Sequence, residues 1–342
     1  MKYLTFAYPE EPAHPRIGAL LGETVLDLEA ASKWALATRG LPHENLPGTL
    51  FEHIHAGPAA WAYARNLINV LEGEDPRQLF ESQGGRPVGL ALNQILLYPP
   101  LPRPTSLRDF YAFEAHVATA NANRGREVPP EWYEFPVFYF SNPNAIFGPG
   151  ETIPYPAFSQ ALDYELEVAC VIGTAGRDIK ESDAGAHIFG YTILNDWSAR
   201  DIQRREMRVG LGPAKGKDFA SSLGPWITTP EELTDRATGR PGVYDLVMSA
   251  RVNGEERSQG NWKDIHYSFG EMIARASTDA YLLPGDVLGS GTVGTGCLLE
   301  LTRGQGPWLA PGDVVSLEIE RLGTLENRVG SPSRAAMKQE KH

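Results

Sequence analysis

The chain has 342 residues, a hydrophobic content of 42% and a formal net charge of -12 at pH 7. This length exceeds that of a single small domain, so we expect one large domain with a substantial core and one smaller domain. The acidic charge argues against a protein that binds nucleic acid or an anionic membrane, because both need clustered Lys and Arg. The expected partner is a small molecule, with no nucleic acid and no membrane.

The cysteines and the lengths of the hydrophobic runs indicate the expected cellular compartment. Cys170 and Cys297 each lie in an apolar stretch, so neither a disulfide framework nor a thiolate metal site is predicted. The N-terminal residues lack the apolar region and the cleavage site of a signal peptide. No run approaches the roughly 18 apolar residues of a membrane span. We expect a soluble, cytoplasmic protein.

Residues 1–90 predict a small α+β domain. A polar, Gly-rich stretch over residues 72–87 closes this part of the chain. The segment 95–104 then contains Pro99, Pro100, Pro102 and Pro104, which exclude a helix or a central strand and predict a stiff, extended connector. We therefore place the domain boundary near residue 90. The strands expected before it are Tyr3–Ala7, Arg16–Leu21 and Thr24–Leu26, and the helices are Leu28–Ala37 and Ala59–Leu71.

Residues 91–330 predict a larger, β-rich domain. A helix is expected over Leu107–Arg124, with Thr105 or Ser106 as its N-cap. Beyond it, short apolar runs separated by Gly and Pro predict a mixed β-roll or barrel, so the expected fold class is α+β. Residues 331–342 are polar and without periodicity, which predicts a flexible tail. The expected strands are Val137–Phe140, Ala145–Phe147, Glu165–Ile172, His187–Leu194, Trp226–Thr228, Asp245–Val252, Val287–Ser290, Cys297–Leu301 and Val314–Ile319, and the further helices are Ile179–Ala186, Ser198–Met207 and Phe269–Ala280.

The segment that starts at Asp163 places carboxylates at alternate positions just as the chain becomes apolar and β-branched. Side chains alternate between the two faces of a strand, so Glu165 and Glu167 point the same way. Adjacent like charges in a buried strand repel each other and lose hydration, a cost of several kcal/mol that a bound divalent metal offsets. The alternative is a solvated acidic face that ends in a core strand.

Two further clusters have side chains that suit a catalytic site. Asp109 and His116 are almost two helical turns apart, so they share one face of the expected helix; a helix cap and a core histidine are the alternatives. Asp196 lies at the end of an apolar strand, and Arg200 and Gln203 project from one side of the helix that follows. An Arg beside an amide suits a substrate carboxylate, whereas the alternative is a solvated helix face with Asp196 as its cap.

Two glycine-containing loops complete the candidate set. Lys217 follows Gly216 in an irregular segment, where its ammonium group lies either near a developing anion or at the surface. The run Gly289–Gly294 resembles a phosphate loop only loosely, because it lacks the GxxxxGK[ST] pattern. A nucleotide-binding site is therefore not predicted.

Five segments together resemble the fumarylacetoacetate hydrolase family. They match in order and spacing over residues 95–325, and the run Asn195–Gln203 is the most specific of them. The N-terminal residues resemble the smaller domain of the family only in size and general character. The five segments are Arg108–Tyr111 with His116, Asp163–Glu167, Asn195–Gln203, Gly216–Lys217 and Gly289–Thr292.

The resemblance implies a site and a reaction. Four carboxylates would hold Mg²⁺ or Ca²⁺, and a base-activated water would cleave the carbon–carbon bond of a fumarylacetoacetate-like or acylpyruvate-like diketo acid, as in aromatic amino acid catabolism. The alternative is a hydratase, isomerase or decarboxylase of a related 2-oxo acid. A homodimer is also implied. The implied residues are Asp109, Glu165, Glu167 and Asp196 for the metal, His116 as base with Glu300 and Lys217 for catalysis, and Tyr139, Arg200, Gln203 and Thr292 for substrate binding.

Some positions depart from the family pattern or allow two interpretations. Many members that act on acylpyruvates carry Phe-x-Lys-Pro where this chain has Phe140–Pro143 without a lysine, whereas Tyr139 resembles the diketone hydrolases proper. Lys215 is a weaker candidate for the catalytic lysine. Glu114 either assists proton transfer or faces solvent, and we expect solvent. Asp163 is expected to have a structural role outside the metal ligands.

Overall fold

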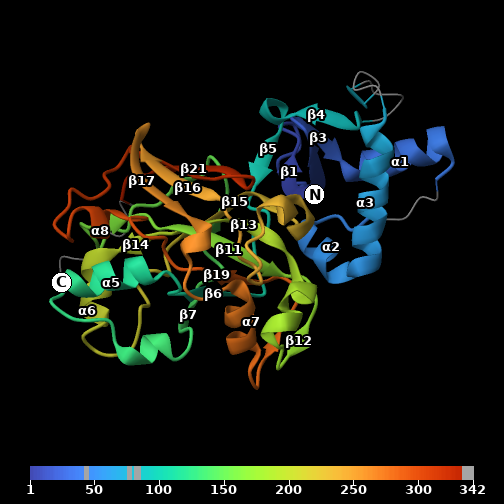
Figure 1. The fold of residues 1–342 in the computed structure, drawn as a ribbon. Helices are drawn as coiled ribbons and strands as arrows, with labels where there is room; N and C mark the ends of the chain where they lie inside the picture. The colour runs from blue at the N-terminus through green and yellow to red at the C-terminus, as the bar shows by residue number, and fades with distance from the viewer. Residues whose placement is uncertain (42–45, 75–78, 81–85, 333–342) are drawn as a thin grey trace.

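The computed structural model describes residues 1–41, 46–74, 79–80 and 86–332 (Figure 1). The predicted Gly-rich stretch 72–87 lies partly outside the described residues, and so does the predicted tail from residue 333 onward. The fold is α+β and rich in strands, as predicted. Among the described helices, none combines the length and the apolar character that crossing a membrane requires.

The N-terminal part contains the predicted strands and helices. Among the described residues, it also contains α2 (Leu50–Ala56), a helix that the sequence pattern did not predict, because seven residues give too few repeats of a helical period. The elements are β1 (Lys2–Ala7), β2 (Arg16–Leu21), β3 (Thr24–Asp27), α1 (Leu28–Arg39), α2 (Leu50–Ala56), α3 (Pro58–Glu72), β4 (Gly89–Ala91) and β5 (Leu96–Tyr98).

The rest of the chain is built from short strands with few helices. Its helices are α5 (Glu114–Ala122), α6 (Arg200–Glu206), α7 (Phe269–Ser277) and α8 (Leu298–Leu301). Its strands are β6 (Ser106–Phe110), β7 (Phe138–Ser141), β8 (Ile146–Phe147), β9 (Thr152–Ile153), β10 (Leu162–Asp163), β11 (Leu166–Ile172), β12 (Gly176–Arg177), β13 (Ile188–Asp196), β14 (Ser198–Ala199), β15 (Ser221–Thr228), β16 (Val247–Val252), β17 (Glu255–Asn261), β18 (Tyr281–Leu282), β19 (Asp286–Gly289), β20 (Val314–Ile319) and β21 (Gly323–Val329).

One mixed sheet of 12 strands runs through both predicted domains. Its main order is β4-β3-β2-β1-β15-β13-β11-β19-β6-β7, with β5 on β1 and β8 on β15. The N-terminal strand β1 therefore pairs directly with β15, which lies more than 200 residues later in the chain. A second sheet has the order β17-β16-β20-β21-β9. The division near residue 90 stays a prediction, because the sheet continues across it.

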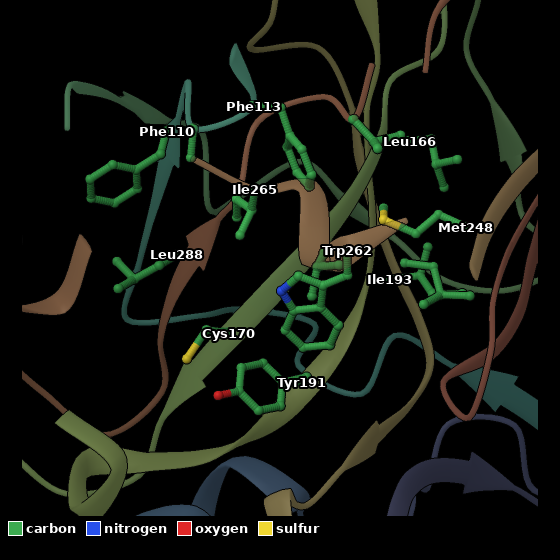
Figure 2. Close-up of a cluster of buried hydrophobic side chains, with 14 of the residues drawn as sticks. Phe110, Phe113, Leu166, Cys170, Tyr191, Ile193, Met248, Trp262, Ile265 and Leu288 are labelled. Carbon is green, nitrogen blue, oxygen red and sulfur yellow. The ribbon is translucent and has the colours of Figure 1, made fainter. Parts of the chain in front are cut away.

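The strand β11 separates two hydrophobic cores. All seven of its residues are buried, and it is paired on both edges, with β13 and β19. One face, with Leu166 and Cys170, packs against Met248 and Trp262 of the second sheet and its flanking turn (Figure 2). The other face packs under α1, α2 and α3, which lie on the opposite side of the molecule from α5, α6 and α8 (Figure 1). This central strand carries Glu167, and Glu165 directly precedes it.

The N-terminus of α1 is fixed by a buried aspartate. The side chain of Asp27 accepts hydrogen bonds from the backbone N–H groups of Glu29 and Ala30, both at 3.1 Å. It also accepts one from Arg16 Nε at 2.7 Å. The first two bonds satisfy two of the backbone N–H groups that have no partner within the first turn of a helix, and the bond from Arg16 pairs the buried negative charge of Asp27.

The predicted helix over Leu107–Arg124 is wrong in its first part. Those residues form β6, which pairs with β19 and β7, and the helix α5 begins only afterwards. The apolar positions fit a strand as well as a helix, and pairing within the sheet decides between them. Asp109 therefore lies on a strand and His116 on a helix, so they do not share one helix face. The proposed N-cap at Thr105 or Ser106 is also wrong.

Three other predictions need correction. The segment Cys297–Leu301 is not a strand, because its last four residues form the single turn α8. The helix predicted over Ile179–Ala186 is a 3₁₀ helix over Glu181–His187. The helix predicted from Ser198 begins two residues later, because β14 first pairs with β10. Short apolar runs do not distinguish helix from strand, and the sheet again decides.

Candidate active site

Four carboxylates from neighbouring strands meet at one end of the large sheet. Asp109 comes from β6, Glu165 from the residue just before β11, Glu167 from the second residue of β11, and Asp196 from the last residue of β13. One ligand oxygen of each lies within 4.8 Å of those of the others. The strand between β6 and β11 contributes Gly289, where a Cβ would lie 2.5 Å from Asp109 Oδ1. The absence of a side chain at this position leaves room for the cluster.

Two buried cations and a phenol contact this cluster. Lys217 Nζ donates to Glu165 Oε2 at 2.6 Å and to Asp196 Oδ2 at 2.5 Å. Arg200 Nη2 lies 2.8 Å from Glu165 Oε1. The Tyr139 hydroxyl donates to Asp196 Oδ2 at 2.5 Å. Both oxygens of Glu165 are therefore held by positive charge, whereas each of the other three carboxylates keeps an oxygen for a further partner.

The protonation of the cluster follows from burial and from these charges. Burial and the nearby Asp196 raise the pKa of Asp109 to about 8. Burial and the neighbouring carboxylates raise the pKa of Glu167 well above its usual value. Burial also opposes ionisation of Glu165, but Lys217 and Arg200 hold the pKa of Glu165 below its usual value. If all four groups were ionised, they would carry more negative charge than the two cations stabilise.

The donor set fits a hard divalent cation. Among the described residues, Asp109 Oδ1, Glu167 Oε1 and Asp196 Oδ1 are buried and accept no hydrogen bond. A buried acceptor without a partner is costly, and a cation coordinated by these oxygens would remove the cost. All the ligand atoms are oxygens, which Mg²⁺, Ca²⁺ and Mn²⁺ prefer. The residues present can therefore hold such an ion.

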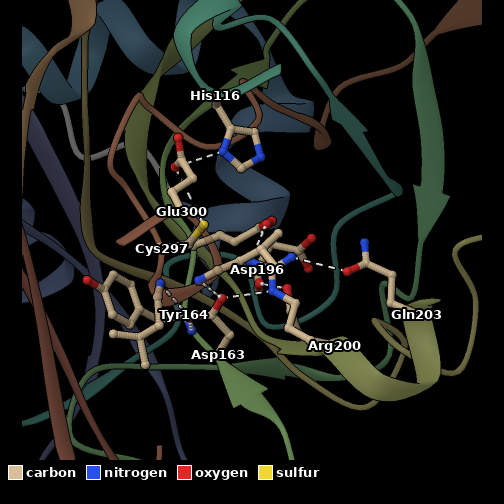
Figure 3. A network of polar contacts seen from close by, with 12 residues as sticks. His116, Asp163, Tyr164, Asp196, Arg200, Gln203, Cys297 and Glu300 are labelled. Carbon is tan, nitrogen blue, oxygen red and sulfur yellow. Dashed lines mark hydrogen bonds and ion pairs between the residues drawn. The ribbon is translucent and has the colours of Figure 1, made fainter. Parts of the chain in front are cut away.

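A histidine and a glutamate form a second buried pair (Figure 3). His116 Nδ1 on α5 lies 2.8 Å from Glu300 Oε2 on α8. The same oxygen is 3.5 Å from Cys297 Sγ, and Thr295 N donates to Glu300 Oε1 at 3.3 Å. Burial raises the pKa of the Cys297 thiol well above its usual value, which disfavours the thiolate that a metal ligand needs. The group therefore fits an oriented histidine better than a metal site.

The two nitrogens of His116 have different surroundings. Nδ1 lies 2.8 Å from the Glu300 carboxylate, so we assign the proton of the neutral ring to Nδ1. The ring lines a cavity of about 260 Å³. Nε2 is then the basic nitrogen of a side chain at the cavity wall.

Arg200 is fixed by three partners (Figure 3). Its Nε donates to Asp163 Oδ2 at 2.8 Å, and its Nη1 donates to Gln203 Oε1 at 3.1 Å. The third contact is the one to Glu165. Burial opposes its charge, but Glu165 and Asp163 raise the pKa of Arg200 well above its usual value. The guanidinium group is thus a permanent, rigidly held cation at the cavity wall.

The structure brings most of the predicted site residues to one cavity. Thr292 is buried there, and among the described residues its hydroxyl has no hydrogen-bond partner. In the same glycine loop, Gly291 N donates to Glu167 Oε2 at 3.1 Å, so this loop binds a carboxylate within the protein. Glu167, Asp196 and Glu300 lie behind the wall rather than in it. The predicted residues that line the cavity are Asp109, His116, Tyr139, Glu165, Arg200, Gln203, Lys217 and Thr292.

Two other candidates from the sequence lie away from the cavity, and one side chain that was not predicted lines it. Lys215 is exposed and pairs with Asp218, so it does not compete with the buried lysine of the cluster. Glu114 is half exposed and accepts a hydrogen bond from Tyr133, away from the cavity. Arg124 lines the cavity and was not singled out in the sequence. Its only local signal was its place just after a helix, which many surface arginines share.

Comparisons with known proteins agree with this geometry. The family model "Fumarylacetoacetate (FAA) hydrolase C-terminal" matches residues 105–330, which is well over half of the chain. This chain belongs to the fumarylacetoacetate hydrolase family. The match includes all four carboxylates of the cluster and the pair of His116 and Glu300.

Relatives within the fumarylacetoacetate hydrolase family carry different names. The oxaloacetate tautomerase YisK of Bacillus subtilis (strain 168) is 30% identical over 313 residues, covering 90% of this chain and 93% of that protein. The fumarylacetoacetase of Arabidopsis thaliana is 30% identical over 353 residues, covering 87% and 83%. The fumarylacetoacetate hydrolase structure from Exiguobacterium antarcticum has a TM-score of 0.69 and 26% identity, and covers 97% and 99%. The chain is thus an enzyme of this family, whose members include both hydrolases and tautomerases.

Proposed function

We propose that this enzyme is a metal-dependent hydrolase that cleaves the carbon–carbon bond of a fumarylacetoacetate-like or acylpyruvate-like β-diketo acid. The observation that carries the proposal is the 2.8 Å contact between His116 and Glu300, with the histidine at the wall of the cavity that Asp109 and Glu165 also line. Hydrolysis needs a base that activates water. A histidine held by a carboxylate is suited to that task near neutral pH.

The proton transfers follow from the orientation of His116. Its Nε2 takes a proton from a water molecule in the cavity, and Glu300 stabilises the imidazolium ion that forms. The resulting hydroxide attacks a carbonyl carbon of the substrate. The neighbouring carbon–carbon bond then breaks, and its electron pair leaves on the departing fragment as an enolate. The imidazolium ion returns its proton to the enolate carbon, which regenerates the base.

The remaining residues bind charge and orient the substrate. Asp109, Glu165, Glu167 and Asp196 would hold a divalent cation, with Mg²⁺ or Ca²⁺ as first candidates; when bound, it supplies Lewis-acid stabilisation of the negative charge that develops on the substrate. Burial opposes the charge of Lys217, but Asp196 and Glu165 raise the pKa of Lys217 above its usual value, so the side chain stays an ammonium ion.

The walls of the cavity would then fix the orientation of the substrate. Arg200 and Gln203 offer a guanidinium group and an amide beside each other, which suits a substrate carboxylate. Tyr139 and Thr292 contribute hydroxyl groups at other points of the wall. A ligand held at several such points would present one carbonyl to His116.

The second candidate is an isomerase, tautomerase, hydratase or decarboxylase acting on a related 2-oxo acid. It is favoured by the 30% sequence identity to the oxaloacetate tautomerase YisK. A tautomerase moves a proton between carbon and oxygen, so it also needs a group that transfers protons, but it breaks no carbon–carbon bond. The two candidates therefore differ in their products.

The test is a spectrophotometric assay of substrate loss with product analysis. Fumarylacetoacetate, acylpyruvates, oxaloacetate and unsaturated 2-oxo acids would be supplied with and without Mg²⁺. We expect cleavage of a diketo acid into two acids, abolished by chelation and by His116→Ala, whereas His116→Ala keeps its affinity for Mg²⁺. The control His55→Ala changes an exposed histidine far from the cavity and should leave turnover unchanged.

Two outcomes would contradict the proposal. Unchanged cleavage by His116→Ala would exclude this residue as the base. Undiminished Mg²⁺ binding by the double variant Glu165→Gln with Glu167→Gln, measured by calorimetry, would exclude the proposed ligands. If oxaloacetate is tautomerised and no diketo acid is cleaved, the second candidate replaces the first.

A further inference from the structure

We propose that Asp163 is a positioning residue that couples the pair of His116 and Glu300 to the substrate-facing Arg200. The inference rests on the proposed function, in which Glu300 orients the base. Asp163 is fully buried and belongs neither to the four-carboxylate cluster nor to the cavity wall. Its hydrogen bonds nevertheless connect it to two parts of the site, the helix that carries Glu300 and the side chain of Arg200.

The first part is the start of the helix α8. Asp163 Oδ1 accepts a hydrogen bond from Leu298 N at 2.8 Å, and Oδ2 accepts one from Leu299 N at 3.0 Å. The residue before α8, Cys297, provides no side-chain cap. A one-turn helix has only free N–H groups at its start, so a carboxylate from another part of the chain satisfies them. Asp163 therefore fixes where α8 begins.

The position of α8 decides the position of Glu300. Glu300 is the third residue of this helix, and its carboxylate reaches His116 Nδ1 at 2.8 Å. Its other contacts, with Thr295 N at 3.3 Å and Cys297 Sγ at 3.5 Å, are longer and come from the same loop. The bonds from Asp163 attach the first two residues of this helix to β10, and the neighbouring loop is attached to β11 by the 3.0 Å bond from Leu166 N to Gly296 O. A shift of α8 would therefore change the orientation of the base.

The second part is Arg200. The same oxygen that accepts from Leu299 N also accepts from Arg200 Nε at 2.8 Å (Figure 3). The strand pairing of Asp163 with Ser198 places the carboxylate beside the start of α6. Removing this acceptor would leave the buried Nε without a partner and release one of the three contacts that orient the guanidinium group. One carboxylate thus fixes both a base and a substrate-binding cation.

The substitution Asp163→Asn tests this role with little change in volume. An amide has a single acceptor oxygen, and its NH₂ group cannot accept from Leu299 N or from Arg200 Nε. We expect kcat to fall by about tenfold or more, because small displacements of catalytic groups have effects of this size. KM should rise as well, since Arg200 loses an anchor. Affinity for Mg²⁺ in the absence of substrate should change little.

Asp27→Asn is a matched control within the same chain. Asp27 is equally buried, accepts from two N–H groups at the start of a helix, and also accepts from an Arg Nε. It lies in the N-terminal part and does not line the cavity. Both variants should lose a similar amount of stability in urea unfolding, but only Asp163→Asn should change kcat and KM. Equal kinetic effects of the two variants would overturn the inference.

A double-mutant cycle separates a positioning role from a general loss of structure. If Asp163 affects kcat through Glu300, then Asp163→Asn should lower kcat no further in a Glu300→Gln background, whereas its effect on KM, which passes through Arg200, should persist. If the effects of the two substitutions on kcat multiply, the inference is overturned. The proposed function then stays intact, because it is tested separately by His116→Ala. If Asp163→Asn does not fold, Asp163→Glu, which keeps the charge and moves it by one methylene, takes its place in the cycle.

Discussion

Replacing Gly289 with alanine tests whether Asp109 and Glu167 hold a metal. The new Cβ would lie 2.5 Å from Asp109 Oδ1 and 3.1 Å from Glu167 Oε2. The first distance is about 1 Å shorter than a favourable contact between non-bonded heavy atoms. Pairing between β19 and β6 fixes both backbones, so the Asp109 carboxylate has to move. Metal–ligand distances tolerate only about 0.2 Å, so a displacement of several tenths of an ångström would disrupt coordination.

We expect the affinity of Gly289→Ala for Mg²⁺ to fall about 10- to 100-fold, which corresponds to about 1.4–2.7 kcal/mol at 25 °C. Isothermal titration calorimetry on the purified protein measures it directly. Gly185→Ala is the control, because a Cβ at that position meets no atom within 4 Å. A folded Gly289→Ala protein that binds Mg²⁺ within about twofold of the wild type would refute the placement of the metal between these carboxylates.

Three further predictions concern stability and charge. Burial lowers the pKa of His53 to about 4, so as the pH falls the unfolded chain binds a proton at this residue before the folded chain does. The free energy of unfolding should therefore fall by about 3 kcal/mol between pH 6.5 and pH 4. Urea unfolding of His53→Leu should lack this loss, and parallel curves of stability against pH for the variant and the wild type would contradict it. Lys217→Ala should lower kcat about 100-fold or more, whereas Lys215→Ala, at an exposed position, should leave it unchanged in the same assay. Met248→Ala should lower the free energy of unfolding by about 2–5 kcal/mol, because this side chain is buried. Val247→Ala, on the exposed face of the same strand, should lower it by less than about 1 kcal/mol. Equal losses for the two variants in urea unfolding would contradict the burial pattern.

Much of the fold was predictable because many elements are marked by local pattern. The strand β20 has the predicted bounds, since its apolar and polar residues alternate between a buried and a more exposed face. The strand β11 differs from its prediction by only one residue, because the apolar run Val168–Ile172, rich in β-branched residues, is typical of a buried strand. The succession of short apolar runs and helical stretches along the chain was enough to predict an α+β fold.

The site was predictable in its residue types but not in its geometry. Asp109 was expected on a helix, and pairing with β7 and with β19, 180 residues later, makes it part of a strand. The capping of α8 by Asp163 joins residues 135 positions apart. No local pattern contains such contacts, because they arise when the strands assemble. Grouping of the carboxylates around one point is a property of the sheet, not of any segment.

The pairing of β1 with β15 has a consequence for how the protein is made. On the ribosome, β1 and β2 emerge long before β15. β5 can pair with Thr5–Ala7 of β1 once residues 96–98 have been made, but the Lys2–Tyr3 part of the same edge has no partner until residues 221–228 have been synthesised. An unpaired strand edge invites association with other chains, and contacts between distant residues form slowly. Nascent chains should therefore be most prone to aggregation before β15 leaves the exit tunnel. Expression at a lower temperature or with added chaperones should raise the soluble yield for this reason.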